Sequence, residues 1–536
     1  MNKKRFCMIL ASAMMMPCIS GCSNKVEVVD ESVSSIEMGE VLTESSKEVE
    51  KVTEEGTDVS NSRSHIFFNM GNYEMSYCSD DGTKLFEGSY SEVLFNKSTR
   101  ADYPKVVESI EEFCNSSLKG TLEFRDEVLD QVKNETESDS GRHNPTRASK
   151  KSMEARRVDE NVISFKNFLY IHFGGAHGEH GYGGVSFDTQ TGEKIELRDI
   201  IKDKDALVKC VKDKLNRYYP DIQKIGEVDE SFKDDSLDNI NWCMDPEGIT
   251  IFFNPYVIGT YADGVQAIPI SFTENPEIFN DKYSKNEGDW ALNGDNVYID
   301  SDGNGIYERI TVEEKRASDH VDGFNIFIDD QEYEVDLKGQ SHSYVWIKRG
   351  DKYFLYVTTY DENNTSRLNV YSITPDDVQD VYSGEEGLKP SNLKYVFGED
   401  VEGEIVGCIS DPDRFYIGTK VQALSEYIGI RVAKVGDDGI PVPKDELYYK
   451  IDTFDNKKLT SKVPLELDKV DREENILGKE TIPEGTKFTI YRTDNESFVD
   501  IRAEKGDFYR VYFDVNTNLQ KINGMDIEEV FDGIRF

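Results

Sequence analysis

The pattern of hydrophobic and polar positions divides the chain into a first part with helices and a second part made of short strands. Apolar residues recur every three or four positions over 103–118 and 207–218, and this spacing predicts two amphipathic helices. Residues 163–173 and 249–253 are rich in β-branched and aromatic side chains, which predicts strands. Because helices and strands alternate irregularly, residues 63–282 are expected to form one α+β domain.

From about residue 283 the helical spacing fades and short alternating segments separated by tight turns take over. The expected strands are 325–328, 332–336, 344–347, 353–359 and 368–373. A last meander, at 487–491, 498–502 and 508–513, is similar to a small SH3-like barrel. The predicted fold class is an α+β N-terminal domain followed by β-rich C-terminal modules at 283–400 and 401–536.

The N-terminal residues have the character of an export signal rather than of folded structure. A basic run, Lys3-Lys4-Arg5, precedes an apolar stretch at 6–16, which is shorter than the roughly 18 residues needed to span a bilayer. The tetrapeptide Ile19-Ser20-Gly21-Cys22 matches the bacterial lipobox. We therefore predict a lipoprotein signal peptide at 1–21, removed by cleavage before Cys22, whose thiol is lipidated. Two acyl chains hold a protein stably at a membrane.

Residues 22–62 contain many acidic and serine residues and no aromatic residue, which predicts a disordered acidic tether. The expected location of the mature protein is the outer face of the cytoplasmic membrane, lipid-anchored and extracellular. Its expected partner there is the cell membrane itself, through the lipidated Cys22.

Charge and cysteine usage narrow the classes of function. The chain of 536 residues has 62 Lys and Arg against 104 Asp and Glu, a formal charge of −42, which disfavours nucleic-acid binding. Eight cysteines are present, and those outside the first 22 residues are widely spaced, without a CxxC pair. These cysteines are Cys78, Cys114, Cys210, Cys243 and Cys408. Their spacing predicts neither a disulfide framework nor a zinc site, and we expect buried free thiols with at most one or two disulfide bridges.

Residues 134–157 turn polar and locally basic, which predicts a mobile insertion loop on the α+β domain. Such a run is usually a solvated set of charges. Its functional alternative is a contact with an anionic wall polymer.

A glycine-rich segment at 174–184, directly after the strand expected at 163–173, holds the densest group of reactive side chains. Six of its eleven residues are glycine, so its backbone can approach a ligand closely. The functional interpretation makes His172, His177, Glu179 and His180 a metal site, because imidazoles and carboxylates are zinc ligands. The favoured interpretation is a structural turn, because a glycine-rich turn is a poor rigid platform for metal ligands.

A second candidate is the segment Asp300-Ser301-Asp302-Gly303-Asn304-Gly305-Ile306-Tyr307-Glu308. Oxygen ligands at alternate positions can converge on one calcium ion, as in an EF-hand loop. The twelfth position is Thr311 rather than a bidentate Glu, so the expected affinity is modest. The predicted ligands are Asp300, Asp302, Asn304, the Ile306 carbonyl and Glu308, and a metal-free β-turn is the alternative.

Several motifs in a fixed order carry a family resemblance. They are the strand followed by Gly174-Gly175-Ala176-His177-Gly178, then the segments 187–194 and 197–200, and finally 248–256 leading to Tyr261-Ala262-Asp263-Gly264. Together they resemble, over 63–282, the extracellular domain shared by the lysozyme-sensing anti-sigma factor RsiV and the non-catalytic part of the peptidoglycan deacetylase PdaC. The resemblance implies a wall-exposed α+β domain which, in the anti-sigma member, grips lysozyme.

The motifs favour a binding protein over an enzyme. No GxSxG, P-loop or dinucleotide fingerprint occurs, and the paired Asp and His-x-x-x-His set of the deacetylase is missing. The predicted function is non-catalytic binding of a wall-associated ligand, either a lysozyme-like cationic protein or peptidoglycan glycan. The alternative is a metal-dependent wall-polymer hydrolase using His172, His177 and His180. The candidate ligand-binding residues are His177, Glu179, His180, Tyr182, Tyr256 and Tyr261.

Overall fold

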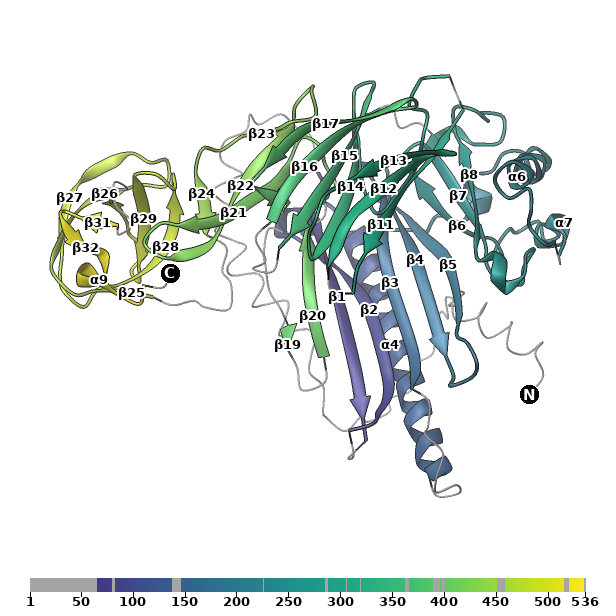
Figure 1. Cartoon of the computed structure of the whole chain (residues 1–536), viewed down its shortest axis with the longest axis horizontal. Coiled ribbons are helices and arrows are strands. Elements are labelled where there is room, and N and C mark those ends of the chain that lie inside the picture. The colour runs from purple at the N-terminus through teal and green to yellow at the C-terminus, as the bar shows by residue number, and fades with distance from the viewer. Residues whose placement is uncertain are drawn as a thin grey trace.

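The structure is a computed structural model in which most described residues lie in β-strands (Figure 1). It describes residues 65–79, 82–136, 146–224, 226–284, 288–304, 306–318, 320–361, 366–388, 396–397, 401–407, 409–450, 458–514 and 520–534. The predicted signal peptide and the lipidation site Cys22 lie outside these residues, as does the predicted tether.

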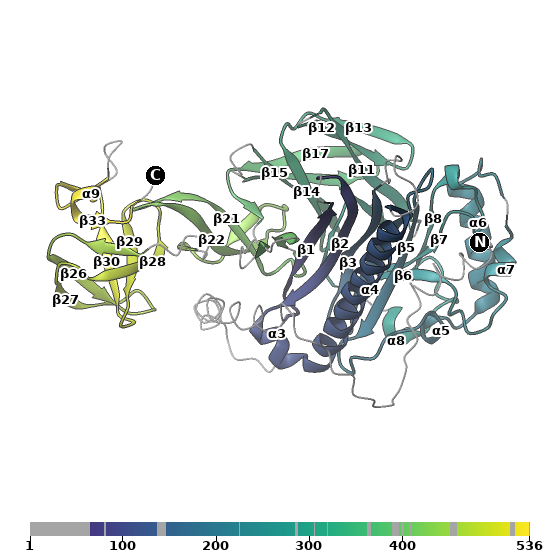
Figure 2. The ribbon, with the colours of Figure 1, turned by 90° about the horizontal axis from the view of Figure 1, so that it is seen from below.

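A seven-stranded sheet, in the order β19-β20-β1-β2-β3-β4-β5, forms the N-terminal layer. Its strands are β1 (Phe68–Cys78), β2 (Lys84–Phe95), β3 (Arg147–Val158), β4 (Val162–His172), β5 (Glu179–Asp188), β19 (Val396–Phe397) and β20 (Val401–Gly407). The short helix α3 (Lys97–Asp102) leads into the long helix α4 (Pro104–Thr136), which lies along one face of the sheet (Figure 2). The helix packs there because its apolar stripe, Val106, Val107, Ile110 and Cys114, is buried against Phe68, Val93 and Phe165.

A smaller layer packs beside β5. It contains the sheet β6 (Asn241–Asp245), β7 (Gly248–Phe253) and β8 (Gln266–Ser271), and the helices α5 (Leu197–Ile200), α6 (Lys204–Tyr218), α7 (Val228–Ser231) and α8 (Asp281–Ser284). The 3-10 helix η1 (Tyr261–Asp263) precedes β8. A Cβ at Gly184 of β5 would lie 2.4 Å from the Trp242 carbonyl oxygen, so this close crossing requires glycine. The α+β architecture predicted for this part is confirmed.

The next part is a sandwich of two antiparallel sheets. One contains β10 (Asn296–Ile299), β11 (Glu308–Arg316), β12 (Val321–Ile328) and β13 (Gln331–Val335). The other has the order β17-β16-β15-β14-β9, with β9 (Trp290–Asn293), β14 (Ser341–Arg349), β15 (Lys352–Tyr360), β16 (Ser366–Thr374) and β17 (Asp377–Gly384). Their inner faces bury Trp290, Phe324, Trp346 and Leu355 together.

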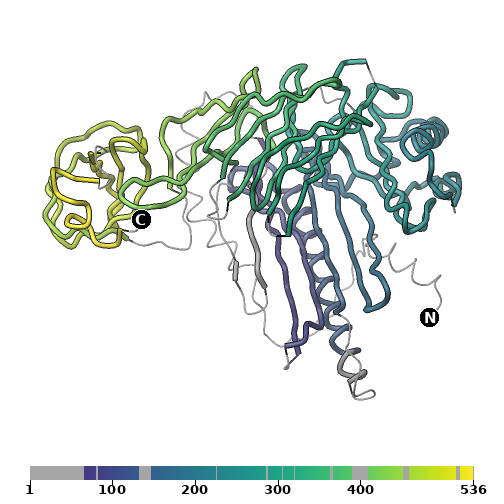
Figure 3. Tube along the Cα trace, in the orientation of Figure 1, coloured from purple at the N-terminus to yellow at the C-terminus, as the bar shows by residue number. Residues whose placement is uncertain are grey.

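The remaining strands join the sandwich to a C-terminal module at the end of the molecule opposite α6 and α7 (Figure 3). The two-residue strand β18 (Gly387–Leu388) pairs with β21, at the end of a larger sheet that runs through β22, β24, β28, β29 and β30 to β26 and β27. The bounds are β21 (Phe415–Gln422), β22 (Glu426–Val435), β23 (Pro441–Pro443), β24 (Tyr448–Lys450), β25 (Leu459–Ser461), β26 (Leu465–Val470), β27 (Ile476–Ile482), β28 (Lys487–Thr493), β29 (Phe498–Ala503), β30 (Phe508–Tyr512), β31 (Lys521–Ile522), β32 (Met525–Asp526), α9 (Ile527–Val530) and β33 (Phe531–Asp532).

The β-rich character predicted for the second half is confirmed. No closed barrel of the SH3 type is found among the described residues. The predicted boundary at 400/401 does not separate two independent sheets, because β20 pairs with β1 and the side chains of β21 and β22 join the buried cluster of β15 and β16.

The prediction of a mobile basic loop at 134–157 is wrong over 147–157, since these residues form β3, inside the N-terminal sheet. Arg156 and Arg157 are only 2% and 1% exposed. Each arginine pairs with an acid two residues away, Glu154 or Asp159, and also has a partner that is distant in sequence. The distant partners, which the local pattern does not show, are Asp245, to which Arg156 Nε donates at 2.7 Å, and the Tyr283 carbonyl oxygen, to which Arg157 Nη1 donates at 2.7 Å. Residues 137–145 lie outside the described residues.

The four described cysteines are free, so no disulfide is formed among them. Cys114 and Cys243 are buried and Cys210 is half-buried, as predicted for free thiols, whereas Cys78 is exposed. Burial raises the pKa of the Cys114 thiol to about 12, which keeps it unreactive. Cys408 lies outside the described residues.

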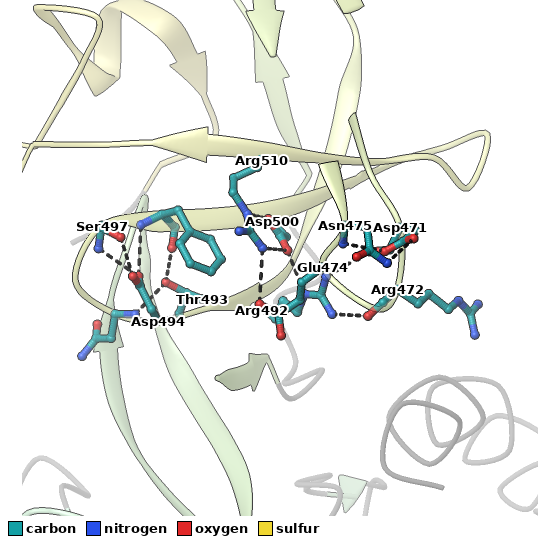
Figure 4. Close-up of polar contacts among 12 residues, drawn as sticks. Asp471, Arg472, Glu474, Asn475, Arg492, Thr493, Asp494, Ser497, Asp500 and Arg510 are labelled. Atoms are coloured by element: carbon teal, nitrogen blue, oxygen red, sulfur yellow. Dashed lines mark hydrogen bonds and ion pairs between the residues drawn. The ribbon is translucent and has the colours of Figure 1, made fainter. Parts of the chain in front are cut away.

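A buried ion network holds the C-terminal module together (Figure 4). Asp500 is fully buried and accepts hydrogen bonds from Arg492 Nε and Arg510 Nε, both at 2.7 Å. Arg492 also donates to the carbonyl oxygens of Asp471 and Arg472, in the turn between β26 and β27. One buried carboxylate is therefore the counter-charge shared by two arginines on the strands that flank it, β28 and β30, and Glu474 lies 3.7 Å from Arg510 as a second acid. Arg492 in turn fixes the turn beside them.

Replacing Asp500 by Ala should destabilise this module strongly, because Arg492 and Arg510 both lose the buried carboxylate that they share. We expect a loss of about 3–5 kcal/mol in the free energy of opening of β28–β30. Hydrogen exchange of the amides in these strands measures it. The control is Glu504→Gln, which removes the exposed ion pair with Lys458 and should cost about 0.2–1 kcal/mol. Equal protection in the two variants would contradict the assigned role of Asp500.

Candidate ligand-binding surface

The loop after β7 is fastened to the edge strand β5 by one side chain. Asn254 Oδ1 accepts a hydrogen bond from Tyr182 N at 2.8 Å, and Asn254 Nδ2 donates to Tyr182 O at 3.0 Å. The Asn254 side-chain amide thus makes the two hydrogen bonds with the Tyr182 backbone that a residue of a further strand would make at the edge of β5. A Cβ at Gly181 would lie 2.8 Å from the Asn254 side chain, so glycine is needed beside it. We call this double hydrogen bond the Asn254 clamp.

The clamped loop presents Tyr256 to solvent. Tyr256 has a φ of 70° and is 52% exposed. A non-glycine residue in the left-handed region costs of order 1–3 kcal/mol and persists only where the surroundings enforce it. Tyr256 N donates to Gly259 O at 3.0 Å, and Val257 N donates to Asn254 O at 3.0 Å. The loop is therefore a constrained turn with a tyrosine at its tip.

Aromatic rings from three segments meet around Tyr261. Its ring centroid lies 4.5 Å from His177, 5.5 Å from His180 and 5.9 Å from Tyr256. The Tyr261 hydroxyl donates to the Gly178 carbonyl oxygen at 3.0 Å, which joins η1 to the start of β5. Phe168 of β4 extends the group, since its ring lies 6.4 Å from His180 and 5.2 Å from Tyr182.

We define the aromatic surface as Phe168, His177, His180, Tyr182, Tyr256 and Tyr261. Five of the six candidate binding residues from the sequence lie in it. The sixth, Glu179, lies between the two histidines at the start of β5. Burial raises the pKa of its carboxyl group, although the charge of nearby His177 acts in the opposite direction. Sequence reasoning missed Phe168 and the Asn254 clamp. The sequence feature that could have identified Asn254 as a loop-fixing residue is its position directly after β7 and before Pro255 and Tyr256.

The histidines of the alternative zinc site are not gathered around one point. His172 contacts the Thr146 carbonyl oxygen through Nδ1 at 2.9 Å and the Gly175 carbonyl oxygen through Nε2 at 3.2 Å. His177 Nδ1 lies 3.0 Å from the Gly178 carbonyl oxygen, the backbone contact of a structural turn. Throughout the described ranges, just one group of three or more His, Cys, Asp or Glu side chains brings its ligand atoms together, and it contains no histidine.

That group is the predicted calcium loop between β10 and β11. Ligand oxygens of Asp300, Asp302 and Glu308 lie within 4.8 Å of one another. Asn304 Oδ1 accepts a hydrogen bond from Ile306 N at 2.7 Å, and Asp302 Oδ1 accepts one from Asn304 N at 2.9 Å. Burial is the main cause that raises the pKa of Glu308, and the negative charges of Asp302 and Asp300 raise it further. The hydrogen bonds that Glu308 accepts from Ser301 lower the pKa, but by less. The three carboxylates suit a cation, and calcium binding stays a prediction.

Comparison with known proteins identifies one family domain. The family model described as "Protein of unknown function (DUF3298)" matches residues 198–273, which include α5 to β8 and the loop with Tyr256 and Tyr261. The chain therefore carries a DUF3298 family domain. The finer resemblance to RsiV and PdaC stays a prediction. Among curated proteins no match is found.

Two solved structures of this family are similar to the chain. The crystal structure of a DUF3298 family member from Bacteroides fragilis is 14% identical, with a TM-score of 0.32, covering 42% of this chain and 100% of that one. A DUF3298 family protein from Pseudomonas aeruginosa is 14% identical, with a TM-score of 0.28, covering 41% of this chain and 97% of that one. Across the described ranges, no helix has both the length and the apolar character that crossing a membrane requires.

Calcium should stabilise the protein through the β10–β11 loop. A ligand that binds the folded state alone stabilises it by about 2.7 kcal/mol at 100 times its Kd. We expect calcium to raise the melting temperature of chelator-treated protein, and magnesium to do so less, because it requires a tighter octahedral shell. Calorimetry with Asp300→Asn/Asp302→Asn should show the effect abolished, while the exposed Asp330→Asn keeps it. Identical melting in calcium and in chelator would disprove the site.

Proposed function

We propose that this protein is a non-catalytic, lipid-anchored lipoprotein of the cell envelope that binds a wall-associated ligand through its aromatic surface. The observation that carries the proposal is the exposed ring cluster around Tyr261, presented by a constrained loop. Constrained aromatic side chains suit recognition, because they offer a large contact area and lose little conformational freedom on binding.

The ligand class that fits best is a cationic protein such as lysozyme. Tyrosines are enriched at the centres of protein interfaces, and Tyr256 and Val257 are 52% and 42% exposed side by side. The formal charge of −42 attracts a basic partner and speeds its encounter. The resemblance to a lysozyme-sensing domain points the same way. Peptidoglycan glycan is the second candidate, because the apolar faces of sugar rings also pack against aromatic rings.

The rival function, a metal-dependent hydrolase of wall polymer, is less well supported by the geometry. It requires His172, His177 and His180 to ligate one metal ion. His172 instead contacts two carbonyl oxygens, and His177 and His180 both pack against the Tyr261 ring.

Truncating the aromatic surface should weaken binding to a basic lysozyme. We expect Tyr256→Ala and His177→Ala each to lower the affinity, with Tyr256→Ala costing about 10-fold or more, the loss typical of a hot-spot residue. The matched control is Tyr512→Ala in the C-terminal module, because Tyr512 is 49% exposed and distant in the fold. Surface plasmon resonance at about 50 mM salt, then at higher salt, also measures the electrostatic part. Absence of binding at low salt would remove the cationic partner from consideration.

The lipid anchor is tested separately. If Cys22 carries acyl chains, the wild-type protein should be found in the membrane fraction of the cells that express it, and Cys22→Ser should release it, because membrane affinity rests on the buried CH₂ groups. Cys78→Ser is the control, since it removes an exposed thiol that we do not assign to lipidation. Mass spectrometry of the N-terminal peptide identifies the adduct. An intact leader without an acyl group would refute the envelope location.

A further inference from the structure

A cavity of about 440 Å³ lies between the N-terminal sheet, the smaller layer and the β10–β11 part of the sandwich. One wall comes from β3, β4 and β5, a second from β7 and β8, and a third from β10 and β11. Its volume is in the range of small-molecule sites, which often lie between domains. The cavity begins beside the aromatic surface, since Phe168 and Tyr182 line both.

The charge of this cavity differs from that of the whole chain. Its lining includes three cationic side chains and two acidic ones: Arg156, Lys166, Arg309, Glu154 and Asp295. Asp245, just outside the lining, lies 2.7 Å from Arg156 and brings the charges around the cavity to three of each sign, which is a more basic environment than the chain as a whole provides. In such a partly enclosed site an anionic group is held best by a cation that keeps unused N–H donors.

Lys166 is the cation best placed to receive such a group. Arg156 is already neutralised by Asp245, at 2.7 Å, and lies 3.0 Å from Glu154. Lys166 Nζ lies 2.7 Å from Glu154 and 5.5 Å from the centre of the Tyr182 ring. An ammonium group has three donors, so this single ion pair leaves capacity for a ligand carboxylate. The Lys166 side chain is 12% exposed, so the contact would be largely shielded from water.

The remaining walls suit a ring with one apolar face. Five aromatic side chains line the cavity: Phe168, Tyr182, Tyr219, Phe252 and Tyr298. Aromatic faces pack against the C–H faces of sugar rings, while the hydroxyl group of Thr311 offers hydrogen bonds to sugar hydroxyls.

A larger groove of about 880 Å³ adjoins the cavity. Ser152, Glu154 and Asp295 line both, and the groove continues past β1 and β2 to the stacked rings of Tyr73 and Tyr90, whose centroids are 4.9 Å apart. A ligand held in the cavity could therefore be one unit of a longer polymer.

We propose that this cavity binds a carboxylated saccharide of one or two rings, with its carboxylate at Lys166 and a sugar ring against Phe168 and Tyr182. The site differs from the exposed Tyr256 and His177 contact that we assign to a protein partner. The inference rests on the proposed function in one respect, that an envelope location would expose the cavity to such saccharides.

Isothermal titration calorimetry of the full mature chain tests the proposal with three probes. N-acetylmuramic acid and glucuronic acid carry a carboxylate on different frames, whereas N-acetylglucosamine carries none. We expect at least one acid to bind about 10-fold or more tightly than the neutral sugar, the gain expected from a charge-assisted contact. Comparison of the two acids distinguishes a wall sugar from a uronic acid polymer.

Two variants locate the site. Lys166→Met should reduce binding of the preferred acid to the level of N-acetylglucosamine, and Thr311→Trp should block the cavity from β11 without touching the ion pair. The matched control is Lys348→Met, because Lys348 also pairs with a glutamate, Glu247, and lies 5.7 Å from the centre of a tyrosine ring, Tyr353, outside the cavity. Melting temperatures check that all three variants fold.

The outcomes separate this inference from the proposed function. Loss of acid binding in Lys166→Met and Thr311→Trp, with Lys348→Met unchanged, supports the cavity. Equal binding of acid and neutral sugars, no binding of any probe, or unchanged binding in Lys166→Met overturns it. Because lysozyme binding is measured at Tyr256 and His177, it can fail while saccharide binding persists, and the reverse also holds.

Discussion

The structure depends on neutralising arginines that are buried in the middle of a sheet. Arg156 of β3 donates to Asp245 of β6 at 2.7 Å and to the Asn296 carbonyl oxygen of β10 at 3.2 Å, and so joins three parts of the molecule through one side chain. A buried guanidinium group without its partners is strongly destabilising. The positions of the smaller layer and the sandwich relative to β3 are therefore coupled.

A second constraint places the aromatic surface. In the Asn254 clamp, one side-chain amide forms hydrogen bonds with the edge strand β5 where a further strand would otherwise pair. The loop that follows adopts a left-handed conformation at Tyr256. The clamp, the glycine beside it and the Tyr261 hydroxyl bond all fasten the same loop to β5. A rigid platform of this kind suits recognition of a ligand, since the rings are positioned before the ligand arrives.

Local patterns predicted the elements well where burial follows a simple period. The stripe of Val107, Ile110 and Cys114 predicted α4, and the β-branched run at 249–253 predicted β7, because each element buries one face or its whole length. The same reasoning failed for 147–157, where it placed a loop. Hydropathy counts arginine as a surface residue, whereas Arg156 and Arg157 are buried with partners more than 80 residues away. The glycine-rich segment and the tyrosines at 182, 256 and 261 were recognised as site candidates, but the contact of Tyr261 with His177, His180 and Tyr256 was not.

By itself, the sequence determined the match of residues 19–22 to the lipobox pattern, the acidic charge, the class of each half and the DxDxN spacing of the β10–β11 loop, because these are properties of composition or of neighbouring residues. Tertiary structure alone decided that His177, Tyr256 and Tyr261 share one surface, that β20 pairs with β1, and that Lys166 and Arg309 line one cavity. These arrangements depend on contacts between segments far apart in the chain. Such contacts follow from packing and charge neutralisation in three dimensions, and the spacing of residues along the chain does not reveal them.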